Sequence, residues 1–176
     1  MELKKRLYHR QFELDKPIYS ETRSGESVAS AEHENMLIEK VTRSRAEDAL
    51  KEIRRHYPEA TVEVEVKDGR GILTACQDRF VLSKEFVETE ESLRSPHCMA
   101  EYCRILQGKA RLVLIVPREN ATKTFLRMLE FNQWWLFYYQ IFFYDKEGNI
   151  KRVDRKTWCE MMGRPYEPAP RAPEIT

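Results

Sequence analysis

The clearest alternation of apolar and polar positions lies in the first half of the chain. The run Thr61-Val-Glu-Val-Glu-Val-Lys67 alternates strictly, which is typical of a β-strand with one buried face. Asp68-Gly69 follows it as a turn signal. Two further runs with strand character, Ile72–Cys76 and Arg79–Val87, are separated by Gln77-Asp78. The pattern therefore predicts a meander of three antiparallel strands.

A helix is predicted before this meander. Ser44-Arg-Ala-Glu47 matches a capping box, in which the serine caps the backbone and the glutamate reaches back to it. Pro58 ends the helical pattern. Residues 36–41, just upstream, allow either a helix or a short strand, because their apolar positions fit both periods. The expected inner face of the helix comprises Ala46, Ala49, Leu50, Ile53 and Tyr57.

Helices and strands alternate in the second half of the chain. The run 111–116 is continuously apolar, which favours a strand that is buried on both faces. The helix before it ends at Gly108 and has Met99, Cys103 and Leu106 on its expected inner face. The predicted elements are a helix over 96–107, a strand over 111–116, a helix over 122–131, and strands over 137–144 and 150–153.

Together these elements predict one domain of the α/β (α+β) class. Its mixed sheet contains the three-strand meander followed by helix, strand, helix and strand, and helices flank it. A strand–helix–strand connection of this length favours a parallel pair with a right-handed crossover. The 176 residues are the length of one domain. We expect an arm or linker over 1–29, the domain over 30–163 and a proline-rich tail over 164–176.

Aromatic residues are concentrated near the last strand. Nine of the nineteen aromatic residues fall between 131 and 144. Either both faces of the strand are covered and the rings pack in the core, or some rings form an exposed patch for a subunit interface or base stacking. We expect core packing, with a homodimer interface as the next interpretation. The residues are Phe131, Trp134, Trp135, Phe137, Tyr138, Tyr139, Phe142, Phe143 and Tyr144.

Composition limits the class of protein. With 41% hydrophobic and 34% charged residues, the chain is neither wholly disordered nor a membrane protein. The charged N-terminus lacks the apolar segment of a signal peptide, so we expect a cytoplasmic protein. The four cysteines, which have no CxxC spacing, are expected to be reduced thiols.

The net charge of +1 hides an uneven distribution of charge. Residues 85–91 contain four acids and no base, whereas segments 109–127 and 146–156 carry net charges of +4 and +3. We therefore expect a polarised surface. If the two basic segments are neighbours, they are the expected contacts to the phosphates of DNA or RNA.

The back half of the chain carries a family resemblance. Lys109-Ala-Arg-Leu-Val-Leu-Ile-Val-Pro117 is followed by a helix, an aromatic strand and Asp145-Lys-Glu-Gly-Asn-Ile-Lys-Arg-Val153. With the order of elements, this pattern resembles the restriction-endonuclease-like, or PD-(D/E)xK, nuclease superfamily over roughly residues 30–153. The resemblance implies a nucleic-acid-acting protein, either an Mg²⁺-dependent nuclease or a catalytically degenerate relative.

The same resemblance implies an active site. In that superfamily, carboxylates hold one or two Mg²⁺ ions and a lysine lies near the attacking water. Asp68, at the start of the second strand, is the implied metal ligand and catalytic acid, and Lys84 in the third strand is the implied catalytic lysine. The acid two residues before the lysine is replaced by Leu82. The helix carboxylates that would substitute as metal ligands are Glu34, Glu39 and Glu101.

Two alternatives stay open at this stage. Glu65-Val66-Lys67 offers a second acid-x-Lys pair, with Glu59 before it, although alternating Glu63, Glu65 and Lys67 are also typical of a solvated strand face. If residues 36–41 are a strand, the element order becomes ferredoxin-like. That order favours a non-enzymatic binding or oligomerisation module with the aromatic strand as its interface.

Overall fold

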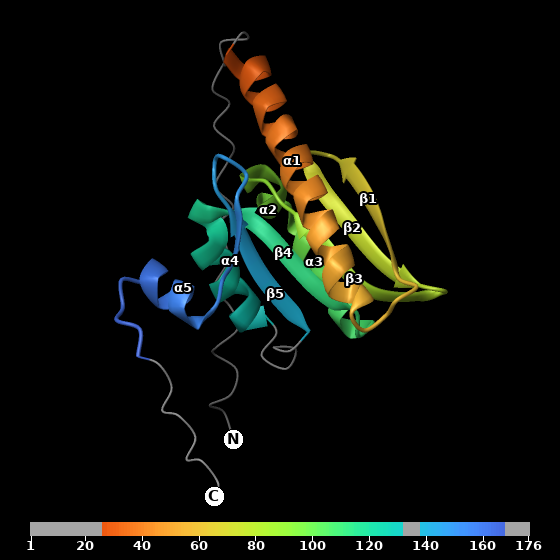
Figure 1. Ribbon diagram of the computed structural model, residues 1–176. Coiled ribbons are helices and arrows are strands. Elements are labelled where there is room, and N and C mark those ends of the chain that lie inside the picture. Colours follow the sequence, from red (N-terminus) through yellow and green to blue (C-terminus); the bar gives the residue numbers. More distant parts are fainter. Residues whose placement is uncertain (1–25, 132–137, 168–176) are drawn as a thin grey trace, which may run out of the picture.

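A six-stranded mixed sheet forms the centre of the protein, in the order β1-β2-β3-β4-β5-β6 (Figure 1). The computed structural model describes residues 26–131 and 138–167. The strands are β1 (Thr61–Lys67), β2 (Arg70–Gln77), β3 (Phe80–Val87), β4 (Arg111–Pro117), β5 (Tyr139–Tyr144) and β6 (Ile150–Arg152). The helices are α1 (Glu26–Arg54), α2 (Glu90–Arg94), α3 (Pro96–Gln107), α4 (Arg118–Phe131) and α5 (Arg155–Met161).

The predicted meander and the parallel pairing of the strands joined through helices are confirmed. Strands β1, β2 and β3 pair antiparallel, β3, β4 and β5 pair parallel, and β6 returns antiparallel to β5. The β1–β2 turn places Asp68 at φ 53° and Gly69 at φ 70°. Left-handed backbone at both central residues suits a two-residue hairpin, which is why the Asp-Gly pair signals one.

Helices cover both faces of the sheet, α1 on one side and α3 with α4 on the other (Figure 1). Because side chains alternate along a strand, β4 contributes to both layers. Val113 and Ile115 belong to the core beneath α1, whereas Leu112, Leu114 and Val116 belong to the core beneath α3 and α4. All five are fully buried, which confirms the strand predicted to be covered on both faces.

The first helix is longer than predicted. Residues 36–41 lie inside α1, so the ferredoxin-like alternative is wrong. Ser44 is exposed in the middle of the helix and caps nothing, because the buried positions Ile38, Val41 and Ala49 form one stripe that passes it. The helix begins at Glu26, whereas we expected the arm to extend to residue 29. No described helix has both the length and the apolar content needed to cross a membrane.

Two local predictions were wrong in part, and two short helices were missed. Helix α4 begins directly after Pro117 rather than at residue 122. In α3 the predicted Leu106 is buried and Met99 packs against the core, but the other buried residues are Cys98 and Tyr102, so Tyr102 takes the place of the predicted Cys103. The short helices α2 and α5 were not predicted, and their N-cap residues, Thr89 and Asp154, are the local signals for them.

The aromatic strand is part of the core. Tyr139 and Phe143 pack toward α3 and α4, whereas Phe142 and Tyr144 pack toward α1. Core packing is therefore confirmed for these four rings, which leaves them unavailable as an exposed subunit interface. Tyr138 is 40% exposed, and residues 132–137 lie outside the described part of the chain.

Gly71 permits the close approach of α1 to β2. A Cβ at this position would lie 2.0 Å from Oγ1 of the buried Thr42. We expect Gly71→Ala to lower the free energy of unfolding by about 1–3 kcal/mol, because the overlap forces α1 away from the sheet. Urea denaturation measures the loss. Thr42→Ala in the same chain should restore much of the stability, and no restoration would contradict this account.

Candidate functional site

The acidic run 85–91 is largely internal. Glu85 is 1% exposed and Glu88 is fully buried, on opposite sides of the sheet. Glu85 pairs with Arg45 of α1, and Glu88 pairs with Arg70 of β2. The expectation of an acidic surface here is wrong for these two residues, because each charge is matched by a buried or half-buried arginine.

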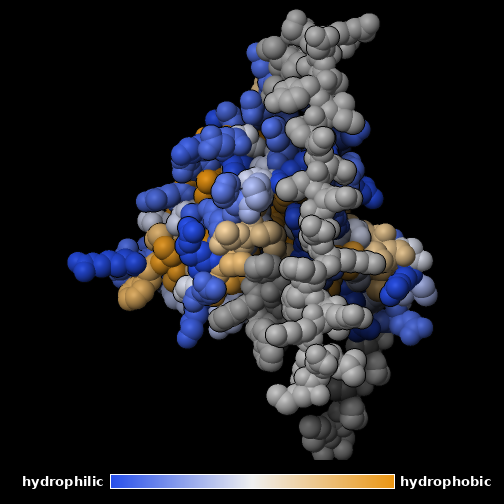
Figure 2. Space-filling view, turned by 180° about the vertical axis from the view of Figure 1, so that it is seen from behind, coloured by the Kyte–Doolittle hydropathy of each residue, from blue (hydrophilic) through white to orange (hydrophobic). Residues whose placement is uncertain are grey.

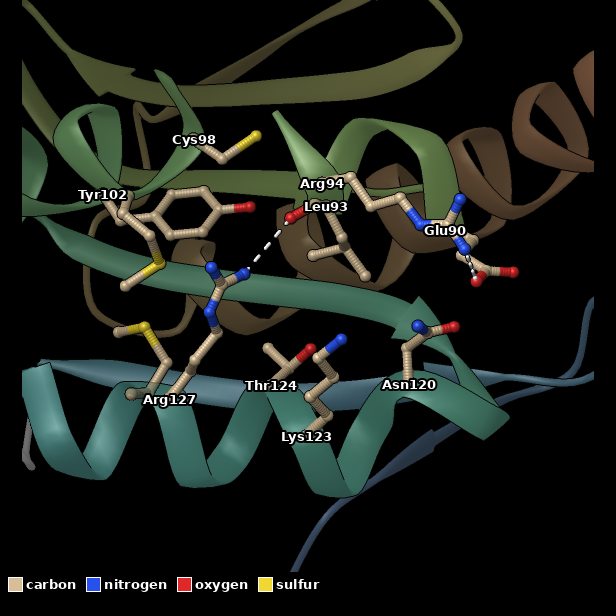
Figure 3. A pocket seen from close by; sticks show the side chains of 11 residues that line it. Glu90, Leu93, Arg94, Cys98, Tyr102, Asn120, Lys123, Thr124 and Arg127 are labelled. Carbon is tan, nitrogen blue, oxygen red and sulfur yellow. Dashed lines mark hydrogen bonds and ion pairs between the residues drawn. The ribbon is translucent and has the colours of Figure 1, made fainter. Parts of the chain in front are cut away.

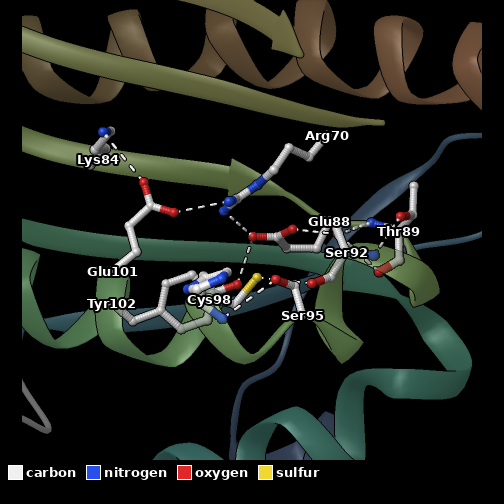
Figure 4. A network of polar contacts seen from close by, with 10 residues as sticks. Arg70, Lys84, Glu88, Thr89, Ser92, Ser95, Cys98, Glu101 and Tyr102 are labelled. Carbon is white, nitrogen blue, oxygen red and sulfur yellow. Dashed lines mark hydrogen bonds and ion pairs between the residues drawn. The ribbon is translucent and has the colours of Figure 1, made fainter. Parts of the chain in front are cut away.

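The Glu88–Arg70 pair is part of a larger polar network, which lies where β2 begins and β3 ends (Figure 4). The Arg70 guanidinium bridges two carboxylates, pairing with Glu88 and, at 2.9 Å, with Glu101 of α3. Its Cζ also lies 4.4 Å from the centre of the Phe86 ring. Tyr102 donates its hydroxyl to Glu88 at 2.6 Å, and the Ser92 hydroxyl donates to the same carboxylate. Each oxygen of Glu88 thus accepts at least one hydrogen bond.

The charges and the burial in this network raise the pKa values of Arg70, Tyr102 and Cys98, so all three keep their protons at neutral pH. Burial opposes the charge on Arg70, but Glu88, Tyr102 and Glu101 together outweigh that effect and the pKa of Arg70 is raised. Burial, reinforced by Glu88, raises the pKa of Tyr102 well above its ordinary value. Burial and Glu88 also raise the pKa of the Cys98 thiol. At neutral pH the cysteine and tyrosine are therefore protonated, which argues against a nucleophilic role for Cys98.

The five implied site residues do not lie in one cluster. The Lys84 ammonium is 3.7 Å from the Glu101 carboxylate on the α3 side of the sheet. Asp68, exposed on the β1–β2 turn, lines a groove with Glu34 of α1. Glu39 pairs with Arg43 on the exposed side of α1. Among the described residues, no group of three or more His, Cys, Asp or Glu side chains could hold a metal ion.

Side-chain alternation along the strands accounts for two further orientations. Glu85 points to the opposite face from its neighbour Lys84, because it pairs with Arg45 of α1 while Lys84 faces α3. Glu63, Glu65 and Lys67 of the edge strand β1 are all exposed. The structure therefore favours the interpretation that Glu65 and Lys67 belong to a solvent-exposed strand face rather than to an active site.

The second network lies beneath α1. Arg45 contacts Glu85 at 2.6 Å and Glu52 at 2.9 Å. Arg111 of β4 extends this network, with Nη2 3.1 Å from Glu52 and 2.8 Å from the side-chain oxygen of Gln140. Burial opposes the charge on Glu52, but Arg45 and Arg111 outweigh it and lower its pKa. This network ties α1 to β3, β4 and β5.

Glu52 provides a pH test of that network. Its lowered pKa means that the stabilisation is present above about pH 4.5 and is lost as the pH falls through the lower value of the folded state. Glu52 is more than one-third exposed, so Glu52→Gln should cost only about 0.5–1 kcal/mol at pH 7. Denaturation at several pH values should show the two proteins converging as the pH falls below about 4.5. A constant difference would contradict the assignment.

A cavity of about 260 Å³ lies between α2, α3 and α4, next to the Arg70 network (Figure 3). Tyr102 lines it and links the two features, because its hydroxyl reaches Glu88. Helix α4 supplies a row of side chains at positions 120, 123, 124 and 127, which repeat at helical spacing on one face. The remaining lining side chains are Glu90, Leu93, Arg94, Cys98, Met99 and Met128.

Part of the first basic segment, helix α4, lies against α5, whose first residues end the second basic segment. The rings of Phe125 in α4 and Trp158 in α5 lie 4.2 Å apart, so the helix that follows β6 packs on α4. On these elements Lys123, Arg127, Arg152 and Arg155 are all exposed. Seen from behind, hydrophilic side chains predominate and apolar ones gather only in separate groups (Figure 2).

Sequence reasoning missed Arg70 and Glu88. Glu88 stood in an acidic run that composition alone assigns to the surface, and Arg70 follows a turn. The available signal was position: Glu88 directly follows the apolar pair Phe86-Val87, where a buried strand ends. Comparison with family models, curated proteins and solved structures finds no significant match for this chain.

Proposed function

We propose that this protein binds nucleic acid on a restriction-endonuclease-like scaffold in which an arginine-centred ion network occupies the place of a metal site. One observation carries the proposal: the Arg70 guanidinium lies between Glu88 and Glu101, at the start of β2 and beside the lysine of β3. The resemblance implies an acid at the start of the second strand. Here that end of β2 carries a cation.

The chemistry of the network supports binding rather than metal catalysis. Mg²⁺ needs carboxylate oxygens that are free to approach it at about 2.1 Å. The Glu88 oxygens accept hydrogen bonds from Arg70, Tyr102 and Ser92, and Glu101 is held by Arg70 and Lys84. Both carboxylates are thus neutralised by fixed donors.

The surface charge supports nucleic acid as the partner. Three of the four acids in the run 85–91 do not offset the basic segments, since Glu85 and Glu88 are buried and Glu90 pairs with Arg94. The fourth, Glu91, is exposed. The exposed cations of α4, β6 and α5 lie on elements that pack together. Such clustered lysine and arginine side chains bind phosphates and release counterions, which gives salt-dependent affinity.

The experiment is an anisotropy titration of the full chain with labelled DNA and RNA duplexes, followed by gel analysis with and without Mg²⁺. We expect a complex at low salt that weakens as salt increases, with both strands intact in Mg²⁺. Absence of any complex at low salt would overturn the proposal. Cleavage that requires Mg²⁺ and is lost in both Asp68→Ala and Lys84→Ala would overturn its non-catalytic part.

A further inference from the structure

We propose that the cavity between α2, α3 and α4 binds an organic phosphate of nucleotide size, with its phosphate held by α4 (Figure 3). The choice of a nucleotide as the organic phosphate rests on the proposed function, whereas the anion site itself does not. The bound group is either a free nucleoside monophosphate or the 5′-phosphorylated end of a strand. These share the same recognised chemistry.

The lining of the cavity has a net positive charge, which suits a phosphate group. Arg94, Lys123 and Arg127 line it, against a single carboxylate, Glu90. Glu90 is neutralised by Arg94 at 2.6 Å. Two positive charges are therefore left over, and they match the charge of a phosphate monoester at neutral pH.

The two remaining cations differ in how they are held. Arg127 reaches across the cavity and donates Nη1 to the Leu93 carbonyl at 3.3 Å, so its guanidinium is positioned by α2 (Figure 3). The Lys123 ammonium has no hydrogen-bond or ion-pair partner among the described residues. A positioned arginine beside an unpaired lysine is a suitable pair of donors for phosphate oxygens.

Thr124 provides an observation independent of charge. It is only 7% exposed, and it lines the cavity with its hydroxyl turned toward the space opposite α4 (Figure 3). Its hydroxyl has no hydrogen-bond partner among the described residues, and the same holds for the Asn120 amide one turn away. Both side chains are therefore free to hydrogen-bond to a phosphate or ribose oxygen that enters the cavity.

The remainder of the cavity suits the organic part of the ligand. Leu93, Met99 and Met128 give it apolar walls, and the Tyr102 ring lines it as well. Methionine sulfur and an aromatic ring both pack well on the flat face of a base. A volume of about 260 Å³ is at the lower limit of small-molecule sites, so it accommodates one nucleotide unit rather than a dinucleotide.

The test is isothermal titration of the full chain with adenosine and uridine 5′-monophosphates at low salt. Lys123→Gln and Thr124→Val should each weaken binding by about tenfold, because each removes one donor to the phosphate with little change in shape. Lys67→Gln, an exposed cation on the edge strand β1, is the matched control and should bind as the wild type does. Circular dichroism confirms that each variant is folded.

Further titrations distinguish the two possible ligands, and they also distinguish failure of the proposed function from failure of the cavity proposal. Tighter binding of a 5′-phosphorylated oligonucleotide than of its 5′-hydroxyl form assigns the strand end, and equal binding of the two with monophosphate binding retained assigns the free nucleotide. If the wild-type chain binds a monophosphate but does not bind a duplex, the proposed function alone is overturned. If neither monophosphate binds, or if all three variants bind equally, the cavity is not the site and this inference is overturned.

Discussion

Replacing Arg70 with methionine is expected to lower the free energy of unfolding by about 3–5 kcal/mol, because it leaves the buried Glu88 carboxylate without its counter-charge. Glu88 has no exposure to solvent, so water cannot take the place of the guanidinium. Methionine keeps much of the volume and the contact with the Phe86 ring, which makes the loss mainly electrostatic. Urea denaturation at pH 7 measures it.

Lys84→Met is the matched control. It removes a cation from the same network, but Lys84 and Glu101 are each about 30% exposed and 3.7 Å apart. Water replaces the ammonium there, so the expected loss is below about 1 kcal/mol. Replacing Arg70 and Glu88 together with apolar residues should recover part of the stability. Equal losses in Arg70→Met and Lys84→Met would contradict the central role of Arg70.

Reversing two charges on α4, Lys123→Glu with Arg127→Glu, is expected to weaken duplex binding at low salt by about a hundredfold. This corresponds to roughly 1.4 kcal/mol for each reversed side chain. Both residues are exposed, and neither has an ion-pair partner among the described residues, so the fold should tolerate the change. Anisotropy titration measures the affinity, and thermal unfolding checks the fold.

Arg55→Glu with Lys67→Glu is the control for net charge. It changes the total by the same amount, but Lys67 lies on β1, at the opposite edge of the sheet from β6. Its effect on affinity should be small, because charges far from the contact surface are screened by salt. Similar losses in the two double variants would indicate that only total charge matters, which contradicts a specific α4 surface.

Periodicity predicted those parts of the fold that local pattern determines. The Asp68-Gly69 turn fixed the first hairpin, and the apolar run 111–116 identified β4 as a strand buried on both faces. The extent of α1 was missed because the polar residues around Ser44 resemble a helix start. Only packing of a continuous stripe against the sheet carries the helix through them.

The candidate site was harder to predict, for a physical reason. Lys84 and Glu101 are 17 residues apart, yet the structure pairs them. The resemblance implied Asp68 as the acid, but Asp68 occupies an exposed turn, and Arg70, two residues later, enters the network instead. Partners of buried charges come from distant segments, here β2, β3 and α3, so their pairing follows from tertiary packing and not from spacing along the chain.

The salt dependence of duplex binding tests the central claim most directly. The logarithm of the association constant should fall linearly with the logarithm of salt concentration, by about 0.9 for each phosphate contact. We predict that Lys123→Glu with Arg127→Glu makes this slope shallower by about 2, while Arg55→Glu with Lys67→Glu leaves it as in the wild type. Parallel lines for all three proteins would contradict the assignment of α4 as the surface that binds nucleic acid.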